Sequence, residues 1–223
     1  MTDLFEPLPQ APGTRRKENT RARLVRASLD VFVERGIDGA TIDDITSAAG
    51  FTRGAFYSNF TSKEEVFGAL FSDVTDQLIA IVAQSAEGTY DNTRLRGNGV
   101  EEHLNDGGVM VDVFEAIRPF SRQWCLIHSD AVARALRDAQ VRAQLTAERL
   151  RLRTAIAEAL QTGMARYGDR SVIPVEDLAQ LFIGVFVDLM VREQLEEIDL
   201  RELGAVTIVR MVEAFTEPSV PTS

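Results

Sequence analysis

Residues whose types and spacing could bind another molecule are concentrated in one stretch, 41–63, which reads TIDDITSAAGFTRGAFYSNFTSK. Its hydrophobic spacing predicts two short helices, 42–49 and 52–59, separated by a turn at Gly50. At about 100° per residue, the outward face of the second helix would carry small or polar side chains and one tyrosine, from Gly54, Ala55, Tyr57 and Ser58. Such a face can approach base edges closely. The stretch therefore indicates a helix-turn-helix whose second helix enters the major groove of DNA.

The other side of this second helix is apolar. Phe56 and Phe60 lie one turn apart, so we expect them to pack on neighbouring helices as core residues rather than to stack on bases. Gly54 should cost the isolated helix ~1 kcal/mol relative to alanine. Close approach of the helix backbone to DNA is a physical reason to keep glycine there.

Residues typical of catalytic or metal sites are few. The chain has one cysteine, Cys125, and two histidines, His103 and His128, which lie too far apart in sequence to suggest a ligand pair. No Ser-His-Asp, metal-binding or phosphate-loop pattern is present. We therefore expect no catalytic residue, no metal site and no cofactor, and we expect that the protein is not an enzyme.

Charge is distributed unevenly along the 223 residues. The formal net charge of −10 argues against a polyanionic partner, yet residues 15–63 carry nine basic and six acidic residues, a net charge of +3. Residues 64–223 carry a net charge of −11. A mildly basic segment on an acidic body favours a polyanion as the partner of that segment.

Helical periodicity dominates the chain, and strand-type alternation is nearly absent. We therefore predict an all-α fold. Glycines and prolines divide the chain into about nine helices, at 17–35, 42–49, 52–59, 62–85, 109–118, 120–137, 139–167, 175–195 and 200–216.

Local signals predict several helix ends. Gly36 should end the first helix, while Thr41 should cap the second helix, which Gly50 stops. Ser62, followed by Glu65 three residues later, predicts a capping box at the start of the fourth helix.

Three segments lie outside the helical pattern. We expect residues 1–14, with three prolines, to form a flexible arm and residues 218–223 to form a polar tail. Residues 88–108, with five glycines, either include a short helix near 100–104 or are mobile. No stretch approaches a membrane span and the N-terminus is acidic, so we expect a cytoplasmic protein with no membrane partner.

Residues 20–66 resemble the DNA-binding domain of the tetracycline-repressor (TetR) family of bacterial regulators. The joint spacing is specific, and the resemblance covers about a quarter of the chain; the remainder is similar only in being helical and of suitable length. The matching residues are Phe32, Gly36, Thr41, Ile45, Ala49, Gly50, Thr52, Gly54, Phe56, Tyr57, Phe60, Ser62 and Lys63.

This resemblance implies roles for individual residues. Major-groove positions would be Arg53, Gly54, Ala55 and Tyr57. Arg53 could contact a guanine through two hydrogen bonds, or contact phosphate only, and Tyr57 could instead be a surface aromatic over the core. DNA-backbone contacts would come from Thr41, Thr52, Asn59 and Lys63, with Arg15, Arg16, Lys17 and Arg21 as additional backbone or minor-groove contacts. Lys63 and the Arg15–Lys17 run could also be ordinary solvated residues. Asp43 is left out because some members of the family have a basic residue there.

The resemblance also implies a larger helical domain over residues 67–217, following a DNA-binding domain over residues 15–66. Its last two predicted helices have wide apolar arcs and would form a homodimer interface, or simply a buried core. The interface candidates are Leu178, Leu181, Phe182, Val185, Phe186, Leu189, Val206, Val209 and Met211. Candidates for an effector pocket, which could equally be core, are Phe114, Arg118, Phe120, Trp124, Cys125 and His128.

Together these patterns predict a homodimeric, bacterial transcriptional repressor that binds a palindromic double-stranded operator. A small-molecule effector would release it by favouring another conformation, so that effector and DNA weaken each other's binding equally. An activator, or a regulator that needs no ligand, is the alternative with the same fold.

Overall fold

The computed structural model describes residues 15–87 and 104–218, and describes side chains for residues 19–87 and 108–218. The α-helices are α1 (Arg15–Gly39), α2 (Ile42–Ala49), α3 (Arg53–Tyr57), α4 (Lys63–Glu87), α5 (Leu104–Ile117), α6 (Ser121–Ala135), α7 (Ala139–Tyr167), α8 (Val175–Glu196) and α9 (Arg201–Phe215). The all-α prediction is confirmed. The predicted arm at 1–14, most of the segment 88–108 and the tail after residue 218 lie outside the described residues.

The ends of α2 follow the local signals. Thr41 Oγ1 accepts the N–H of Asp44 at 3.1 Å, and Asp44 Oδ2 accepts the N–H of Thr41 at 3.0 Å, which makes a complete capping box. Gly50 adopts the left-handed conformation (φ 69°, ψ 34°) that ends a helix at little cost for glycine. The predicted bounds of this helix are therefore confirmed.

Gly36 divides α1 into two helical segments and ends the first of them, as predicted. Its φ of 65° and ψ of 166° are open to glycine, and helical turns resume afterwards as far as Gly39. The peptide N–H of Ile37, which the break leaves without a helical partner, donates to Asp130 Oδ2 at 3.0 Å. The predicted end of the first helical segment is therefore confirmed, and Asp130 of α6 accepts the first N–H group after the break.

The start of α4 differs from the predicted capping box in one bond. Ser62 Oγ accepts the N–H of Glu65 at 3.2 Å, as predicted. The Glu65 carboxylate, however, accepts the N–H and the O–H of Thr61, at 2.8 and 2.9 Å, instead of the N–H of Ser62. These bonds from Thr61 lower the pKa of Glu65.

Two short strands were not predicted. β1 (Asp169–Ser171) and β2 (Thr216–Pro218) pair antiparallel, with Ser171 opposite Thr216. Each strand has three residues, too few for a visible alternation of apolar and polar side chains. A second small departure is the 3-10 turn η1 (Arg118–Phe120), which contains Pro119 and joins α5 to α6.

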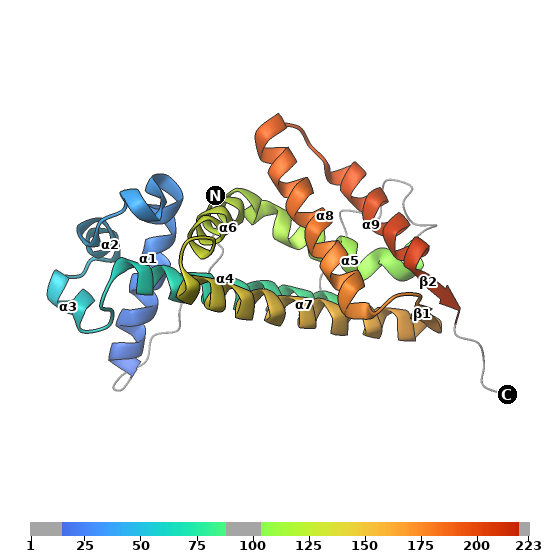
Figure 1. Cartoon of the computed structure of the whole chain (residues 1–223), viewed down its shortest axis with the longest axis horizontal. Helices are drawn as coiled ribbons and strands as arrows, with labels where there is room; N and C mark the ends of the chain where they lie inside the picture. Colours follow the sequence, from blue (N-terminus) through green and yellow to red (C-terminus); the bar gives the residue numbers. More distant parts are fainter. Residues whose placement is uncertain (1–14, 88–103, 219–223) are drawn as a thin grey trace. The chain divides into compact units, whose positions relative to one another are not determined.

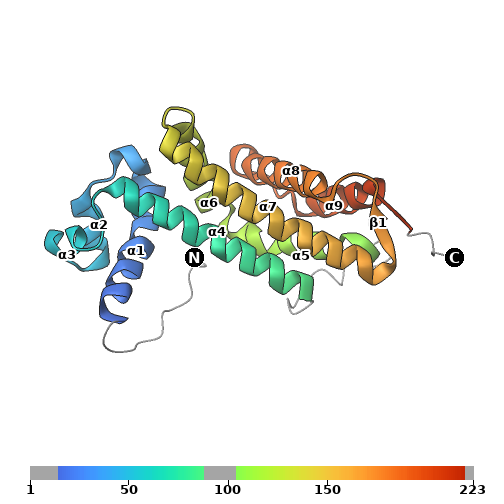
Figure 2. The same cartoon turned by 60° about the horizontal axis from the view of Figure 1, so that its bottom comes forward.

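The chain divides into two compact units, each with its own core. Unit 1 comprises residues 1–76 and 123–148, and unit 2 comprises residues 77–122 and 149–223, so α4 and α7 contribute to both. In unit 1, α1, α2 and α3 surround the first turns of α4 (Figures 1 and 2). Its fully buried side chains include Leu24, Phe32, Ile45, Phe56, Phe60 and Leu70.

Unit 2 is built on α5, α8 and α9, and the views of Figures 1 and 2 agree that α8 and α9 lie side by side. Phe114 of α5 packs on Phe186 of α8, with ring centroids 5.5 Å apart. Against α9, the ring of Phe114 occupies the space beside Gly204, where an added Cβ would lie 2.6 Å from a ring carbon. Glycine at 204 is therefore what allows α5 and α9 to approach this closely.

Among the described helices, α4 alone is long and apolar enough to cross a membrane by length and composition. Its most apolar window has a mean hydropathy of 1.5, and 44% of that window is buried. The buried residues form one stripe that repeats every three or four positions: Val66, Phe67, Leu70, Val74, Leu78 and Val82. The sequence predicted no membrane span, and this one-sided stripe is typical of a core helix.

Candidate nucleic-acid interface

The segment from α2 to α3 is fixed by its backbone. Phe51 donates its N–H to Thr46 O at 2.9 Å, which closes the turn after Gly50. Thr52 then caps α3, because its Oγ1 accepts the N–H of Ala55 at 3.3 Å. Two helices and a tight turn are thus held in the arrangement that the sequence predicted.

The helix α3 buries one side and exposes the other. Phe56 and Phe60 have exposed fractions of 0 and 1%, as expected for core residues, whereas Tyr57 is 57% exposed. The helix is shorter than the predicted 52–59, since Asn59 and Phe60 both donate their N–H groups to Phe56 O and close the chain into a turn. Tyr57 therefore stands on the solvent side of a well-anchored helical turn.

Gly54 lies on the same exposed face. A Cβ added there would have Thr52 Oγ1 as its nearest neighbour at 3.7 Å, an ordinary van der Waals distance. The backbone φ of Gly54 is not positive, so its conformation does not demand glycine either. The fold of this chain gives no reason for glycine at this position, and close approach by a partner remains a physical reason.

Arg53 and Asp43 form an ion pair across the turn. Arg53 Nε lies 2.9 Å from Asp43 Oδ1, with the two side chains 63 and 66% exposed. This contact, which joins the first turns of two different helices, was not predicted from the sequence. The helix-turn-helix geometry itself was the signal that could have revealed it.

Two predicted phosphate contacts already bind groups of the chain. Lys63 Nζ donates to the carbonyl oxygens of Asp38 and Ala40, at 3.0 and 2.8 Å. The Thr41 hydroxyl donates to Asp44 Oδ2 at 2.6 Å. Lys63 begins α4 and Thr41 caps α2. Both side chains therefore lie at helix N-termini, where backbone N–H groups favour anions.

Further predicted contacts lie beside α3. The Arg21 guanidinium is 4.0 Å from the centroid of the Phe60 ring and donates to Asn59 O at 3.4 Å. Asn59 donates its side-chain amide to Ala55 O at 2.7 Å, while its Oδ1 is buried without a hydrogen-bond partner. The side chains of Arg15, Arg16 and Lys17 lie outside the described residues.

Two basic residues support the motif without having been singled out. Arg23 lies over the Phe51 ring, 4.5 Å from its centroid, and donates to Ala49 O at 3.2 Å. Arg35 pairs with Asp44 at 2.8 Å. The hydrogen bonds from Thr41 and, less strongly, the Arg35 charge lower the pKa of Asp44. Arg23 and Ala49 are 26 residues apart, and a contact over that separation has no signature in the sequence.

Residues 24–70 match the profile of the family described as bacterial regulatory proteins, tetR family. The matched segment, residues 24–70, thus resembles the tetR family. The relatives of this chain include the HTH-type transcriptional regulator SrpR of Pseudomonas putida, which is 47% identical over 55 residues, 25% of this chain and 26% of SrpR. The transcriptional activator FasR of Mycolicibacterium smegmatis is 36% identical over 92 residues, 39% of this chain and 42% of FasR.

A third relative, the transcriptional repressor DhaR of a Mycobacterium species, is 36% identical over 67 residues, 30% of this chain and 34% of DhaR. The chain thus matches less than half of the length of each of these relatives. Solved structures extend the likeness of fold. Reduced NemR of E. coli has a TM-score of 0.67 at 13% identity, covering 90% of this chain and 99% of NemR.

A TetR transcription regulator from Haloarcula marismortui has a TM-score of 0.68 at 11% identity, covering 90% of this chain and all (100%) of that protein. At such low identity these likenesses concern the fold alone. They extend the tetR-family fold from the matched segment to the helices that follow it.

The six candidates for an effector pocket are divided between the units. Unit 2 holds Phe114, Arg118 and Phe120, and unit 1 holds Trp124, Cys125 and His128. The rings of Trp124 and His128 stack, with centroids 4.4 Å apart. Partial burial raises the pKa of the Cys125 thiol, which keeps it protonated and weakly reactive.

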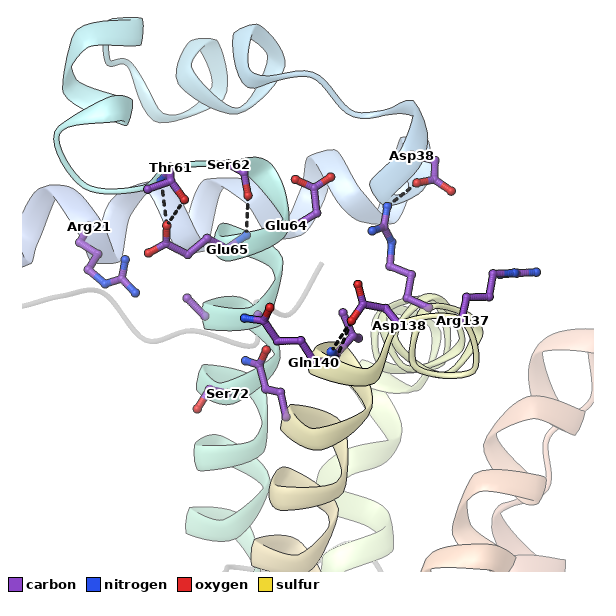
Figure 3. Close-up of a pocket in the computed structure, with 15 residues that line it drawn as sticks. Arg21, Asp38, Thr61, Ser62, Glu64, Glu65, Ser72, Arg137, Asp138 and Gln140 are labelled. Carbon is purple, nitrogen blue, oxygen red and sulfur yellow. Dashed lines mark hydrogen bonds and ion pairs between the residues drawn. The ribbon is translucent and has the colours of Figure 1, made fainter.

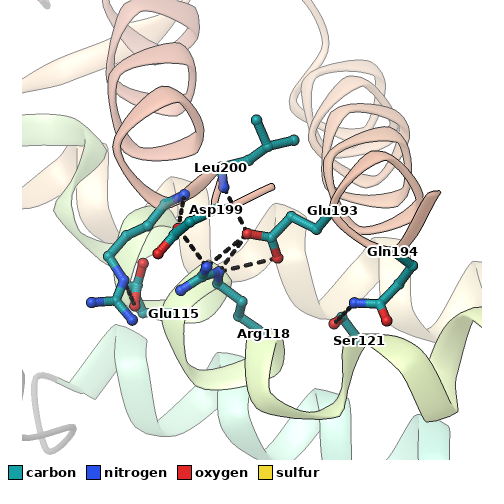
Figure 4. A network of polar contacts seen from close by, with 8 residues as sticks. Glu115, Arg118, Ser121, Glu193, Gln194, Asp199 and Leu200 are labelled. Atoms are coloured by element: carbon teal, nitrogen blue, oxygen red, sulfur yellow. Dashed lines mark hydrogen bonds and ion pairs between the residues drawn. The ribbon is translucent and has the colours of Figure 1, made fainter. Parts of the chain in front are cut away.

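Arg118 already has carboxylate partners (Figure 4). Its Nε donates to Glu193 Oε1 at 2.8 Å and its Nη2 to Asp199 Oδ1 at 2.5 Å. Glu193 also accepts the N–H of Leu200 at 2.9 Å, which ties the end of α8 to the start of α9. Burial raises the pKa of the neighbouring Glu115. An anionic effector at Arg118 would have to compete with two carboxylates.

The nine interface candidates on α8 and α9 divide between core and surface. Five are buried within unit 2: Leu178, Phe182, Phe186, Leu189 and Val209. The other four, Leu181, Val185, Val206 and Met211, are exposed or half-buried. Two further apolar residues, Leu195 and Leu203, are also exposed on these helices, at 79 and 46%.

Unit 1 also contains a polar cleft of about 780 Å³ that the sequence did not predict. Figure 3 shows Thr61 and Glu65 at the start of α4 on one side, and Arg137 and Asp138 at the α6–α7 turn on the other. Its charged groups are of both signs. Within the described part of the chain, no group of three or more His, Cys, Asp or Glu side chains could hold a metal ion.

Proposed function

We propose that this protein is a DNA-binding regulator of transcription whose α3 enters the major groove. The exposed face of α3 carries this proposal: Tyr57 projects from it, and Gly54 leaves space that the fold itself does not require. The buried Phe56 fixes the helix from below. Relatives named as transcriptional regulators support the same role for this chain.

In the proposed complex, Arg53, Gly54, Ala55 and Tyr57 face the base edges. Phosphates are held by Thr41, Thr52, Asn59 and Lys63, with Arg21 and the run Arg15, Arg16 and Lys17 at the flank. The helix N-termini at Thr41 and Lys63 support this division, since they offer backbone N–H groups and a positive dipole end to phosphate.

We further propose that residues 15–66 form the DNA-binding domain and that residues 67–217 carry homodimerisation. A second copy would cover the exposed parts of α8 and α9, around Leu181 and Val206, which are 43 and 47% exposed. Four helices from two chains would then form a bundle. A symmetric dimer would bind a near-palindromic operator of two half-sites.

Whether the protein represses or activates transcription depends on the position of the operator relative to the promoter. We propose a repressor of the bacterial cytoplasm and nucleoid that a small-molecule effector releases, with an activator or a ligand-independent regulator as the alternative. The relatives are named with both directions, DhaR as a repressor and FasR as an activator. Deletion of the gene should raise transcription from the bound promoter; a fall would support the activator instead.

Selection from a pool of randomised duplexes with the purified full chain tests DNA binding directly. We expect a near-palindromic consensus, a footprint on that site in genomic DNA, and weaker binding by Tyr57→Ala. No preference over random duplex at any salt concentration would contradict the proposal.

Light scattering tests the dimer. We expect Val206→Glu, which places a charge in the proposed interface, to give a folded monomer. Leu150→Glu, at a residue of α7 that is 51% exposed, is the matched control and should stay dimeric. A monomeric wild type, or dimers in both variants, would contradict this interface.

A further inference from the structure

Asp43 lies where it can orient Arg53. The carboxylate contacts Nε of the guanidinium at 2.9 Å, on the side of the group nearest the chain. This contact leaves the two terminal nitrogens of Arg53, Nη1 and Nη2, at the outer end of the side chain. Both residues stand on the solvent side of the helix-turn-helix, one in the first turn of α2 and one in the first turn of α3.

A purely structural role explains this pair poorly. An ion pair with both partners more than 60% exposed contributes little to folding, because water screens it. The helix α2 does not need Asp43 as a cap, since the Thr41–Asp44 capping box already serves it. The carboxylate of Asp44 is occupied by Thr41 and Arg35, which leaves Asp43 as the acid that binds Arg53.

The chemistry of base recognition gives the pair a role. A guanine presents two acceptors, O6 and N7, to the major groove, and an arginine can meet both with two donors in one plane. An unrestrained guanidinium can rotate and contact phosphate or other bases equally well. A carboxylate on Nε fixes the plane and leaves the end-on pair of donors, Nη1 and Nη2, for the base.

We propose that Asp43 is a positioning residue for sequence recognition: it holds Nε of Arg53 so that Nη1 and Nη2 meet O6 and N7 of one guanine. The proposal rests on the proposed DNA-binding function and deepens it. The same negative charge lowers the attraction of Arg53 for phosphates, so the pair favours one base over non-specific contact.

The test measures base discrimination at a single position, with the full-length protein. Arg53→Ala first identifies the guanine, as the position of the selected site where the preference is lost. We expect Asp43→Ala to reduce discrimination against the other bases at that position by roughly tenfold, about the value of one bidentate contact. Discrimination at the other positions should remain. In the double variant Arg53→Ala/Asp43→Ala, no further loss is expected, because the two residues act together.

Two variants separate positioning from charge. Asp43→Asn keeps an acceptor oxygen on Nε and should keep most of the discrimination. Glu34→Ala removes the same charge from an exposed residue of α1 and should change affinity for all sequences equally. Circular dichroism checks that each variant is folded.

Several results would overturn the proposal. Asp43→Ala could shift all affinities uniformly, as Glu34→Ala does, could strengthen binding to the guanine site, or could add its loss to that of Arg53→Ala. A wild type without any sequence preference would instead contradict the DNA-binding function itself. The two failures are therefore distinguishable.

Discussion

The α2–α3 segment and the Arg118 cluster both depend on polar contacts, but their partners are separated very differently along the chain. Thr41 and Asp44 are three residues apart, whereas Arg118 and Glu193 are 75 apart. The first region is exposed, and its outer face is the proposed DNA-binding surface. The second is largely buried and joins the α5–η1 junction to the α8–α9 turn. The caps of α2 and α3 thus depend on short-range contacts, whereas the Arg118 cluster joins elements far apart in the chain.

The largest expected effect lies in the scaffold. Arg118→Ala leaves Glu193, whose side chain is only 7% exposed, without its charged partner, and should lower the free energy of unfolding by about 3 kcal/mol. Urea denaturation measures this loss. Arg170→Ala removes an exposed ion pair of the same unit, with Glu217, and should change stability by less than about 1 kcal/mol. Equal losses in both variants would break the distinction between the two regions.

Lys63 has both a structural and a proposed DNA-binding role, since it donates to carbonyls of the chain and is proposed to bind phosphate. Lys63→Ala should lower the free energy of unfolding by roughly 1 kcal/mol, because the carbonyls of Asp38 and Ala40 lose their donor. The slope of log affinity for DNA against log salt should become shallower by about one. Arg137→Ala, at an exposed residue, should leave that slope unchanged. An unchanged slope in the lysine variant would restrict Lys63 to a structural role.

Gly54→Ala should move stability and function in opposite directions. Space exists for the added methyl group, so the free energy of unfolding should rise by about 0.5–1 kcal/mol, while DNA binding weakens. Gly163→Ala in α7, where the added methyl group would lie 3.9 Å from Val109, should stabilise the fold without weakening DNA binding. If Gly54→Ala binds DNA as tightly as the wild type, close backbone approach at this position is wrong.

The smallest expected effect is a difference between the regions in how the stability of the fold depends on pH. The pKa values of Asp44 and Glu65 lie below their ordinary 3.8 and 4.5, so their stabilising contribution is complete above those values and is lost as the pH falls through the lower, folded-state pKa values. The pKa of Glu115 is raised, so its contribution changes in the opposite direction and grows on acidification. Thermal unfolding at a series of pH values measures both.

Variants assign these contributions. Thr41→Ala removes the main cause of the lowered Asp44 pKa and should make the decline of Tm in acid shallower. Glu115→Gln removes the opposing contribution and should make it steeper. Parallel curves for wild type and both variants would show that neither carboxylate controls the acid response.

How well a structural feature was predicted from the sequence depends on how far apart in the chain the contacting residues lie. The bounds of α2 and α7 were predicted to the residue, because caps such as Thr41 and stops such as Gly50 act on their neighbours. In the capping box at the start of α4, the Glu65 carboxylate was predicted to accept the N–H of Ser62 but accepts that of Thr61, one residue earlier. Such a choice depends on side-chain geometry that the sequence does not specify.

The missed features are contacts between distant residues. An apolar arc could not reveal which half of α8 faces the core, so Leu178 and Leu181 were predicted alike, although their exposed fractions are 0 and 43%. The partners of Arg118 were equally invisible, because Glu193 and Asp199 meet it only after α5, α8 and α9 have packed. The pair Arg53–Asp43 was also missed, because the motif places both residues near the turn without specifying which acid faces Arg53.

The close packing of the Phe114 ring against Gly204 constrains how this chain can change through evolution. A side chain there would collide with the Phe114 ring, so any replacement of the glycine requires a smaller residue at 114 first, or at the same time. A single substitution that enlarges residue 204 destabilises the fold, whereas the same substitution combined with a smaller residue at 114 is tolerated. Sequences descended from a common ancestor with this one should therefore show correlated substitutions at the two positions, with total volume rather than residue identity preserved.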